Sequence, residues 1–257
     1  MRCAVIGLGE AGRIYALALK DQGHEVVGYD LAPLSAPGVT RVNTMAEAVE
    51  GAQAVLVMTP ASVSAQIAKE AAAYLSPMTC YADFTSSAPS DKRALEWELP
   101  PGVRPADVAI LGPVISLGVT TPLMAVGPGA QVVADLLTPA GASVEVVQGN
   151  LGDAMGHKLL RSIFMKGLAA LVGEAVEAGR RAGCEEWVRG QIAKELSGDA
   201  QATIDRFIVG SAKHAARRAD EMGAVLEYCE ALGAASDMSA AARKSLLRLQ
   251  ESALDEA

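Results

Sequence analysis

The sequence predicts an α/β fold, namely a doubly wound, Rossmann-type parallel sheet followed by an all-helical C-terminal domain. Short apolar runs alternate with helical stretches over the first 150 residues, and such alternation is typical of a parallel sheet covered on both faces. A glycine-rich turn follows the first apolar run. The rest of the chain lacks proline and is rich in Ala, Leu, Glu and Arg, which favours helix.

Strands and helices are expected to alternate up to residue 150, and the apolar runs are near-continuous, as in strands buried on both faces. The expected strands are residues 2–6, 25–29, 39–42, 54–58, 79–84, 104–110, 123–126 and 143–147. The expected helices between them are residues 11–21, 45–49, 62–74, 89–98 and 131–137.

The pattern changes after Gly149-Asn150, and from there the chain is expected to be helical. Two domains are therefore predicted, an α/β domain over residues 1–150 and a helical domain over residues 151–257. Breaks between the later helices are expected near Gly183, Ser197-Gly198 and Gly233.

Composition excludes several classes of function. The 257 residues carry a formal net charge of −8 and a mean hydropathy of +0.24, which excludes general disorder. The acidic balance also argues against a nucleic-acid binder, which needs a clustered basic face. No stretch approaches the roughly 18 apolar residues of a membrane span, and residues 2–6 lead into a glycine motif rather than a signal peptide. A cytoplasmic protein is expected.

The distribution of charge leaves room for a small anionic ligand. Residues 1–150 contain 8 basic and 14 acidic residues, whereas residues 151–257 contain 14 basic and 16 acidic residues. The excess acid therefore lies mostly in the α/β domain. The cysteines lack the close, patterned spacing of a metal site or a disulfide framework, so neither is expected. They are Cys3, Cys80, Cys184 and Cys229.

The strongest functional signal is a Gly-x-Gly-x-x-Gly turn between the first expected strand and the first expected helix. Its first glycine permits a tight bend, its second lets the backbone approach a pyrophosphate, and its third allows close helix–strand packing. The helix N-terminus offers free N–H groups to phosphate oxygens. A purely structural turn is the alternative. We expect a dinucleotide to contact the turn residues Gly7, Leu8, Gly9, Glu10, Ala11 and Gly12.

Asp30 stands at the end of the second expected strand, 18 residues beyond Gly12. An acidic residue there accepts hydrogen bonds from the adenosine ribose hydroxyls, whereas NADP sites usually place a cation there for the 2′-phosphate. Leu31 and Ala32 offer no cation, and Arg41 is expected on another strand. NAD is therefore favoured as the cofactor, with NADP open as the alternative.

Polar residues follow the fourth and fifth expected strands, at Thr59-Pro60 and in segment 83–87. Ligands of open α/β sheets bind outside the carboxyl ends of the strands, so Thr59, Pro60 and Thr85 are expected to line the cofactor cleft. The alternative is that these hydroxyls cap helices, as Ser87 would cap the helix that follows it.

Segment 152–166 carries a cationic stripe. On a helix, Lys158, Arg161, Ser162 and Lys166 share one face through i, i+3, i+4 and i+8 spacing. Such a face would receive an anion, and the clustered positive charge would lower the proton affinity of one lysine toward neutral pH. A solvated helix face explains the same pattern, so both interpretations stay open.

Together these motifs resemble the β-hydroxyacid dehydrogenase family, related to 6-phosphogluconate dehydrogenase. The glycine turn and the residues up to Asp30 follow the family's opening pattern. Segment 83–89 is similar to its Asp-x-Ser/Thr-Ser segment, and segment 152–158 to the glycine-led motif that holds its catalytic lysine. The resemblance implies an NAD(P)-dependent oxidoreductase acting on CH–OH groups of small hydroxyacids, with Lys158 as the general acid/base.

The chain departs from the family pattern near the expected substrate. Leu111 stands where the family has a substrate-binding serine, and Arg161-Ser162 replaces an asparagine pair. These departures imply a larger or differently placed anion. We expect the substrate to be bordered by Ser86 and Gly112, with Pro113 in place of a family glycine, and to meet the cationic face through Arg161, Ser162 and Lys166.

Segment 214–222 resembles a little-characterised helical domain of a divergent branch of these dehydrogenases. The roles of His214, Arg217 and Arg218 stay open between contact with the cleft and a solvated helix face. The resemblance also implies a homodimer whose helices pack across the interface. The long apolar helix expected from Asp153 onward is consistent with that, since a small domain would struggle to cover it.

Two other functions stay open. An imine reductase resembles this architecture but commonly has Asp or Tyr in place of the lysine, so Lys158 argues against it. A dinucleotide-binding protein without catalytic activity is the second, and the unusual Leu111 is what favours it. The sequence indicates a small anionic substrate without identifying it.

Overall fold

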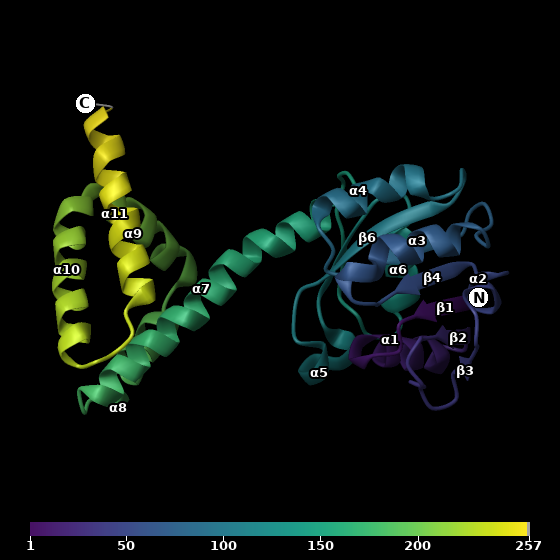
Figure 1. The fold of residues 1–257 in the computed structure, drawn as a ribbon, viewed down its shortest axis with the longest axis horizontal. Coiled ribbons are helices and arrows are strands. Elements are labelled where there is room, and N and C mark those ends of the chain that lie inside the picture. The colour runs from purple at the N-terminus through teal and green to yellow at the C-terminus, as the bar shows by residue number, and fades with distance from the viewer. Residues whose placement is uncertain (256–257) are drawn as a thin grey trace. The chain divides into compact units, whose positions relative to one another are not determined.

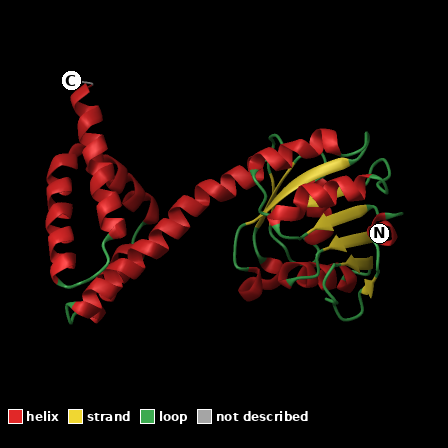
Figure 2. Ribbon diagram, in the orientation of Figure 1, coloured by secondary structure: helices red, strands yellow, loops and turns green. Residues whose placement is uncertain are grey.

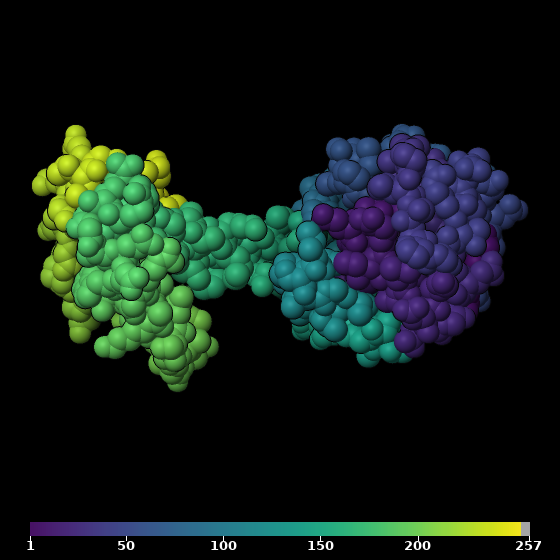
Figure 3. Space-filling view, turned by 90° about the horizontal axis from the view of Figure 1, so that it is seen from below, coloured from purple at the N-terminus to yellow at the C-terminus, as the bar shows by residue number. Residues whose placement is uncertain are grey.

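The computed structural model describes residues 1–255, which form two compact units. The first unit is Met1–Arg161 and the second begins at Ser162. The units divide inside α7 (Asp153–Arg181), whereas the boundary expected from sequence, at residue 150, lies in the loop before that helix. In the space-filling view the first unit is coloured purple to teal and the second green to yellow (Figure 3).

The first unit is built on one eight-stranded sheet, in the order β3-β2-β1-β4-β5-β6-β7-β8 (Figures 1 and 2). The strand order reverses between β1 and β4. The loops that follow these two strands therefore run in opposite directions, and a crevice opens between them at the carboxyl ends of the strands. The predicted α/β fold class and all eight expected strands are confirmed. The strands are β1 (Arg2–Ile6), β2 (Glu25–Tyr29), β3 (Thr40–Arg41), β4 (Ala54–Val57), β5 (Cys80–Asp83), β6 (Arg104–Ile110), β7 (Leu123–Val126) and β8 (Val144–Val146).

Two strands differ from the expected parallel arrangement. β7 runs antiparallel to β6, with Asp107 opposite Val126 and Ile110 opposite Leu123, and β8 runs parallel to β7. The connection, residues 111–122, holds only the short helix α5 (Val114–Leu117) and a 3₁₀ turn. A parallel crossover usually contains a full helix that crosses the sheet, and this twelve-residue connection holds none, so the chain returns antiparallel.

Helices cover both faces of this sheet. On one face, Tyr15 and Leu19 of α1 (Glu10–Asp21) pack with strand residues such as Val5, together with α6 (Ala130–Leu137). On the other, α2 (Met45–Val49), α3 (Ser64–Ala72) and α4 (Pro89–Glu98) cover a second cluster that includes Ile67 and Leu95. Successive strand side chains point to opposite faces, which is why apolar strands need both layers.

The second unit is helical, as predicted. Besides the later part of α7 it contains α8 (Glu185–Leu196), α9 (Ala200–Lys213), α10 (Ala215–Ala231) and α11 (Asp237–Asp255). Gly183 and Gly233, at two of the expected breaks, have φ of +74° and +63°, a backbone conformation that favours glycine. The break at His214 was not expected, because no glycine or proline marks it. Within residues 1–255, no helix is long and apolar enough to cross a membrane.

Candidate active site

The glycine turn after β1 is closely packed against its surroundings. Gly7 has φ +96°, and a Cβ there would lie 2.7 Å from the Met58 carbonyl oxygen; a Cβ on Gly12 would lie 1.8 Å from the Gly7 carbonyl oxygen. Both positions therefore require glycine for packing. Gly9 is different, because a Cβ there would meet nothing within 4 Å. Its role is to leave open the approach to the first turn of α1.

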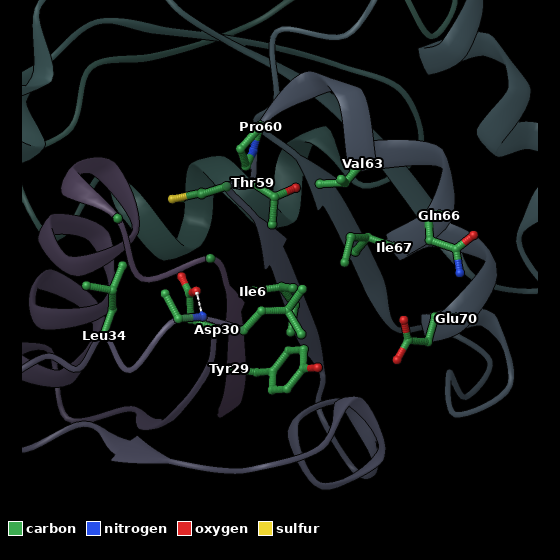
Figure 4. A pocket seen from close by; sticks show the side chains of 15 residues that line it. Ile6, Tyr29, Asp30, Leu34, Thr59, Pro60, Val63, Gln66, Ile67 and Glu70 are labelled. Carbon is green, nitrogen blue, oxygen red and sulfur yellow. Dashed lines mark hydrogen bonds between the residues drawn. The ribbon is translucent and has the colours of Figure 1, made fainter.

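A cleft of about 510 Å³ opens in front of this turn. Figure 4 shows Gln66, Ile67 and Glu70 facing it from α3, with Asp30 and Leu34 on the other side. The cleft is lined by Ile6, Gly7, Gly9, Tyr29, Asp30, Leu31, Ala32, Leu34, Met58, Thr59, Pro60, Val63, Gln66, Ile67 and Glu70.

Asp30 is fixed by two backbone hydrogen bonds at the edge of the cleft. The amide of Leu8 donates to Oδ2 at 2.6 Å, and the amide of Ala32 donates to Oδ1 at 2.8 Å; the second bond is the dashed line in Figure 4. A carboxylate offers about four acceptor positions, so the two oxygens keep capacity for hydroxyl donors of a ligand. The carboxylate thus ties the end of β2 to the glycine turn.

Thr59 carries a polar atom that suits a ligand. Its Oγ1 is buried, lines the cleft, and has no hydrogen-bond partner among the described residues. A buried hydroxyl without a partner costs free energy, so a polar group bound in the cleft would satisfy it. With Gly9 and Asp30, this atom makes the cleft fit a nucleotide that carries ribose hydroxyls and phosphates.

Several residues expected at the cofactor lie elsewhere. The Leu8 side chain is fully buried against Gly28, and Glu10 is exposed beside a second hollow that Arg13 also lines. Thr85 is buried, and its hydroxyl donates to Ser87 Oγ at 3.0 Å. Of the expected cofactor residues, the ones that line the cleft are Gly7, Gly9, Asp30, Thr59 and Pro60.

Lys158 lies in the second turn of α7. Its Nζ donates to Ser86 Oγ at 3.0 Å, and Ser86 follows β5. Burial lowers the pKa of the Lys158 ammonium, and the positive charge of Lys92 lowers it further, while the negative charge of Asp107 acts in the opposite direction. The half-buried Lys158 therefore releases its proton at a lower pH than an exposed lysine does.

Beneath this pair lies a buried cluster of three charges. Lys92, on α4, is fully buried, and its Nζ lies 3.1 Å from Asp83 Oδ1 and 3.5 Å from Asp107 Oδ1. It also donates to the Asp83 carbonyl oxygen at 2.6 Å. Asp83 Oδ2 accepts a hydrogen bond from Ser64 at 2.9 Å, and Asp83 Oδ1 accepts one from the Thr85 amide at 2.8 Å.

Asp107 holds the beginning of α7. Its Oδ2 accepts hydrogen bonds from the amides of Gly152 at 3.0 Å and Met155 at 3.1 Å. Amides at a helix N-terminus lack partners within the helix and carry partial positive charge, so a carboxylate there satisfies and stabilises them. This contact fixes the turn that precedes Lys158.

The remaining expected substrate residues have these positions. Gly112 and Pro113 follow β6, which is parallel to β5, so this loop and the loop of Ser86 leave the same edge of the sheet. Arg161 is exposed on α7, and Ser162 and Lys166 follow on that helix within the second unit. Among residues 1–255, no group of three or more His, Cys, Asp or Glu side chains is placed to hold a metal ion.

Sequence reasoning missed Lys92, although a signal was present. Lys92, Leu95 and Leu99 are spaced i, i+3 and i+7, so the lysine shares the apolar stripe of its helix. A lysine on such a stripe needs a buried anion. Asp83 and Asp107, at the end of one apolar strand and within another, are the anions that satisfy it.

Two families match the chain. Residues 2–133 match the family described as the NAD binding domain of 6-phosphogluconate dehydrogenase. Residues 180–249 match a family described as a domain of unknown function (DUF1932). No curated protein gives a significant match.

Solved structures similar to this chain include two at more than 25% identity. A conserved hypothetical protein from Sinorhizobium meliloti is 26% identical with a TM-score of 0.62, over 96% of this chain and 87% of its own. A conserved protein of unknown function, described as similar to 3-hydroxyacid dehydrogenases, is 27% identical with a TM-score of 0.64. The match covers 99% of this chain and 98% of that protein's chain. A variant of the imine reductase from Myxococcus stipitatus in complex with NAD+ has a TM-score of 0.82 at 18% identity, over 98% and 94%, which shows the fold alone.

The buried charges predict a large stability effect. Replacing Lys92 by Met leaves Asp83 and Asp107 buried without their cation, so the free energy of unfolding should fall by about 3 kcal/mol. The double substitution Lys92→Met with Asp83→Asn, which removes one charge of each sign, should recover part of that loss. Urea titration followed by circular dichroism measures both. Unchanged stability of Lys92→Met would show that the cluster does not hold the fold.

Proposed function

This chain belongs to the family defined by the NAD binding domain of 6-phosphogluconate dehydrogenase, and from that premise we propose that it is an NAD-dependent oxidoreductase. It transfers a hydride between nicotinamide and a small hydroxyacid, or its oxo form. The observation that carries this proposal is the hydrogen bond between Lys158 Nζ and Ser86 Oγ. Ser86 follows β5, which is parallel to the cleft-lining strands β1, β2 and β4, so the loops after these strands leave one edge.

The cleft holds the cofactor in this proposal. Gly7 makes the tight bend and Gly9 leaves space for the backbone to approach a pyrophosphate. Asp30 accepts hydrogen bonds from ribose hydroxyls, and Thr59 Oγ1 meets a polar group of the cofactor. When bound, NAD supplies or accepts the hydride.

Lys158 supplies the proton in this proposal. Reduction of an oxo group adds a hydride at carbon and a proton at oxygen, and the Lys158 ammonium gives that proton. In the oxidation direction the neutral amine takes the hydroxyl proton. Burial and the charge of Lys92 lower the pKa of Lys158, so the neutral base is available at lower pH than for an ordinary lysine. Ser86 holds the amine by accepting one of its hydrogen bonds.

The substrate is proposed to be a small anion. Arg161, Ser162 and Lys166 follow Lys158 on one face of α7 by helical spacing. Arg161, in the same unit as Lys158, would receive a carboxylate or phosphate, and Gly112 and Pro113 would border the substrate. Leu111 in place of a polar residue makes this part of the site more apolar than in the hydroxyacid dehydrogenases that the chain resembles.

Replacing Lys158 by Met should lower turnover at least about 100-fold, because general acid/base catalysis contributes at least that much, and should leave NADH affinity unchanged. Turnover on a hydroxyacid panel and NADH fluorescence titration measure the two effects. The exposed Lys194, replaced by Met, is the matched control and should keep full turnover. Full turnover without Lys158, or turnover only on cyclic imines, would contradict the proposal.

The charges of the cleft favour NAD over NADP. The lining residues that the structure describes include two carboxylates, Asp30 and Glu70, and no lysine or arginine. Arg41 lies on β3, where its guanidinium donates to the carbonyl oxygens of Asp30, Ala32 and Leu34. It therefore stabilises the loop after β2 and is not held out toward the cleft.

NADH should bind at least about tenfold more tightly than NADPH, since tenfold corresponds to only about 1.4 kcal/mol of charge repulsion. Leu31, which is 86% exposed and lines the cleft, offers the test. Leu31→Arg should raise NADPH affinity, whereas Leu31→Ala should leave the preference unchanged. Fluorescence titrations with both nucleotides measure this. Equal or tighter binding of NADPH by the unmodified chain would refute the assignment.

We also propose that the protein is a homodimer through α7. Leu160, Ile163 and Phe164 are 66%, 72% and 63% exposed and are spaced i, i+3 and i+4. They form an apolar stripe suited to packing against another helix. A second copy of the chain presents the same stripe, and two-fold pairing of identical surfaces is the commonest assembly of soluble proteins.

Light scattering of the purified chain should give the mass of a dimer. Ile163→Glu combined with Phe164→Glu should give a monomer, because it places charges in the apolar stripe, and Lys194→Glu on an exposed part of α8 should remain a dimer. A clean monomer for the unmodified chain would rule out this assembly.

A further inference from the structure

The buried lysine contacts both parts of the chain that hold the proposed proton-transfer pair. Ser86 lies three residues after Asp83, and Asp83 binds Lys92 through its carboxylate and its carbonyl oxygen. Lys158 lies on α7, whose first turn is bound by Asp107, and Asp107 binds Lys92 through its other carboxylate oxygen. Each partner of the Lys158–Ser86 hydrogen bond is therefore attached to Lys92 through one aspartate.

We propose that Lys92 is a positioning residue for Lys158: through Asp83 and Asp107 it holds the loop of Ser86 and the first turn of α7 in register. The inference rests on the proposed function for the role of Lys158 itself. Lys92 is fully buried, so it positions the pair through these neighbours and not by contact with the substrate.

The charge balance explains why a lysine is needed here. Two carboxylates in a buried site repel each other unless a cation lies between them, and burying a charge is costly unless it is paired. The amides of Gly152 and Met155 satisfy one oxygen of Asp107, but Oδ1 has no hydrogen bond among the described residues. Its ion pair with Lys92 is then the contact that orients it. An apolar side chain would fill the space without holding either aspartate.

Lys92 also acts on Lys158 through charge. The charged groups around the Lys158 amine include Lys92 from α4 and Asp107 from β6, with Asp83 of β5 bound to Lys92. On α7 itself, the ionisable neighbours in sequence are Asp153, His157 and Arg161. Lys92 disfavours the protonated amine and Asp107 favours it. Removing each of them should therefore move the titration of Lys158 in opposite directions.

Acylation of the Lys158 amine tests this without substrate or cofactor. Only the neutral amine reacts with acetic anhydride, so the pH midpoint of the rate at Lys158, followed by mass spectrometry on the full chain, reports its proton affinity. Lys92→Met should raise that midpoint, because it removes the positive charge that disfavours the protonated amine. Asp107→Asn should lower it. Lys69→Met, an exposed lysine of α3, is the matched control and should leave it unchanged.

The double variant Lys92→Met with Asp83→Asn covers the case in which the single variant does not fold. It keeps the net charge of the cluster and still removes the cation near Lys158, so the midpoint should again rise. An unchanged midpoint in the folded Lys92 variants, or an equal shift in Lys69→Met, would overturn the inference. Where turnover is measurable, its pH profile should move with the midpoint in the Lys92 variants. Full turnover of Lys158→Met would instead overturn the proposed function, and the acylation result would still decide the role of Lys92.

Discussion

The ion pairs of Lys92 with Asp83 and Asp107 are the contacts on which the carboxyl edge of the sheet depends. They join α4, β5 and β6 at one point, and through Asp107 they fix where α7 begins. Breaking a buried pair leaves an uncompensated charge, which is far more costly than losing an exposed ion pair. The lysine thus has a structural effect well beyond its own helix.

The same edge of the sheet divides into two chemically different parts. Around β1, β2 and β4 the structure offers space and acceptors, with Gly9, Asp30 and the buried Thr59 hydroxyl facing the cleft. Beside the loop after β5 lies Lys158 of α7, whose pKa is lowered by burial and by a neighbouring cation. The net charge of −8 predicts the ligand of neither part, because the charged and polar groups within each part decide what it can bind.

The strands, the glycine turn and Asp30 were predictable because each depends on residues close together in sequence. The antiparallel direction of β7 was not predictable, since it depends on whether the preceding connection crosses the sheet through a helix. The buried contacts near Lys158 were not predictable either. They join Asp83, Lys92, Asp107 and Met155, which come together only in the folded structure. The glycine motif correctly marks the cleft, but it does not show which of its residues line it. Leu8 is buried, and Gly12 packs closely against the Gly7 carbonyl group.

Lys92 is proposed to hold the first turn of α7 in place through Asp107. Hydrogen–deuterium exchange of the full chain tests it most directly, by comparing the peptide spanning residues 150–158 in the unmodified protein and in Lys92→Met. Exchange of this peptide should accelerate more in the variant than exchange of β1, which is separated from β5 by β4 and loses protection only through the lower overall stability. Equal protection of residues 150–158 in both proteins would contradict it.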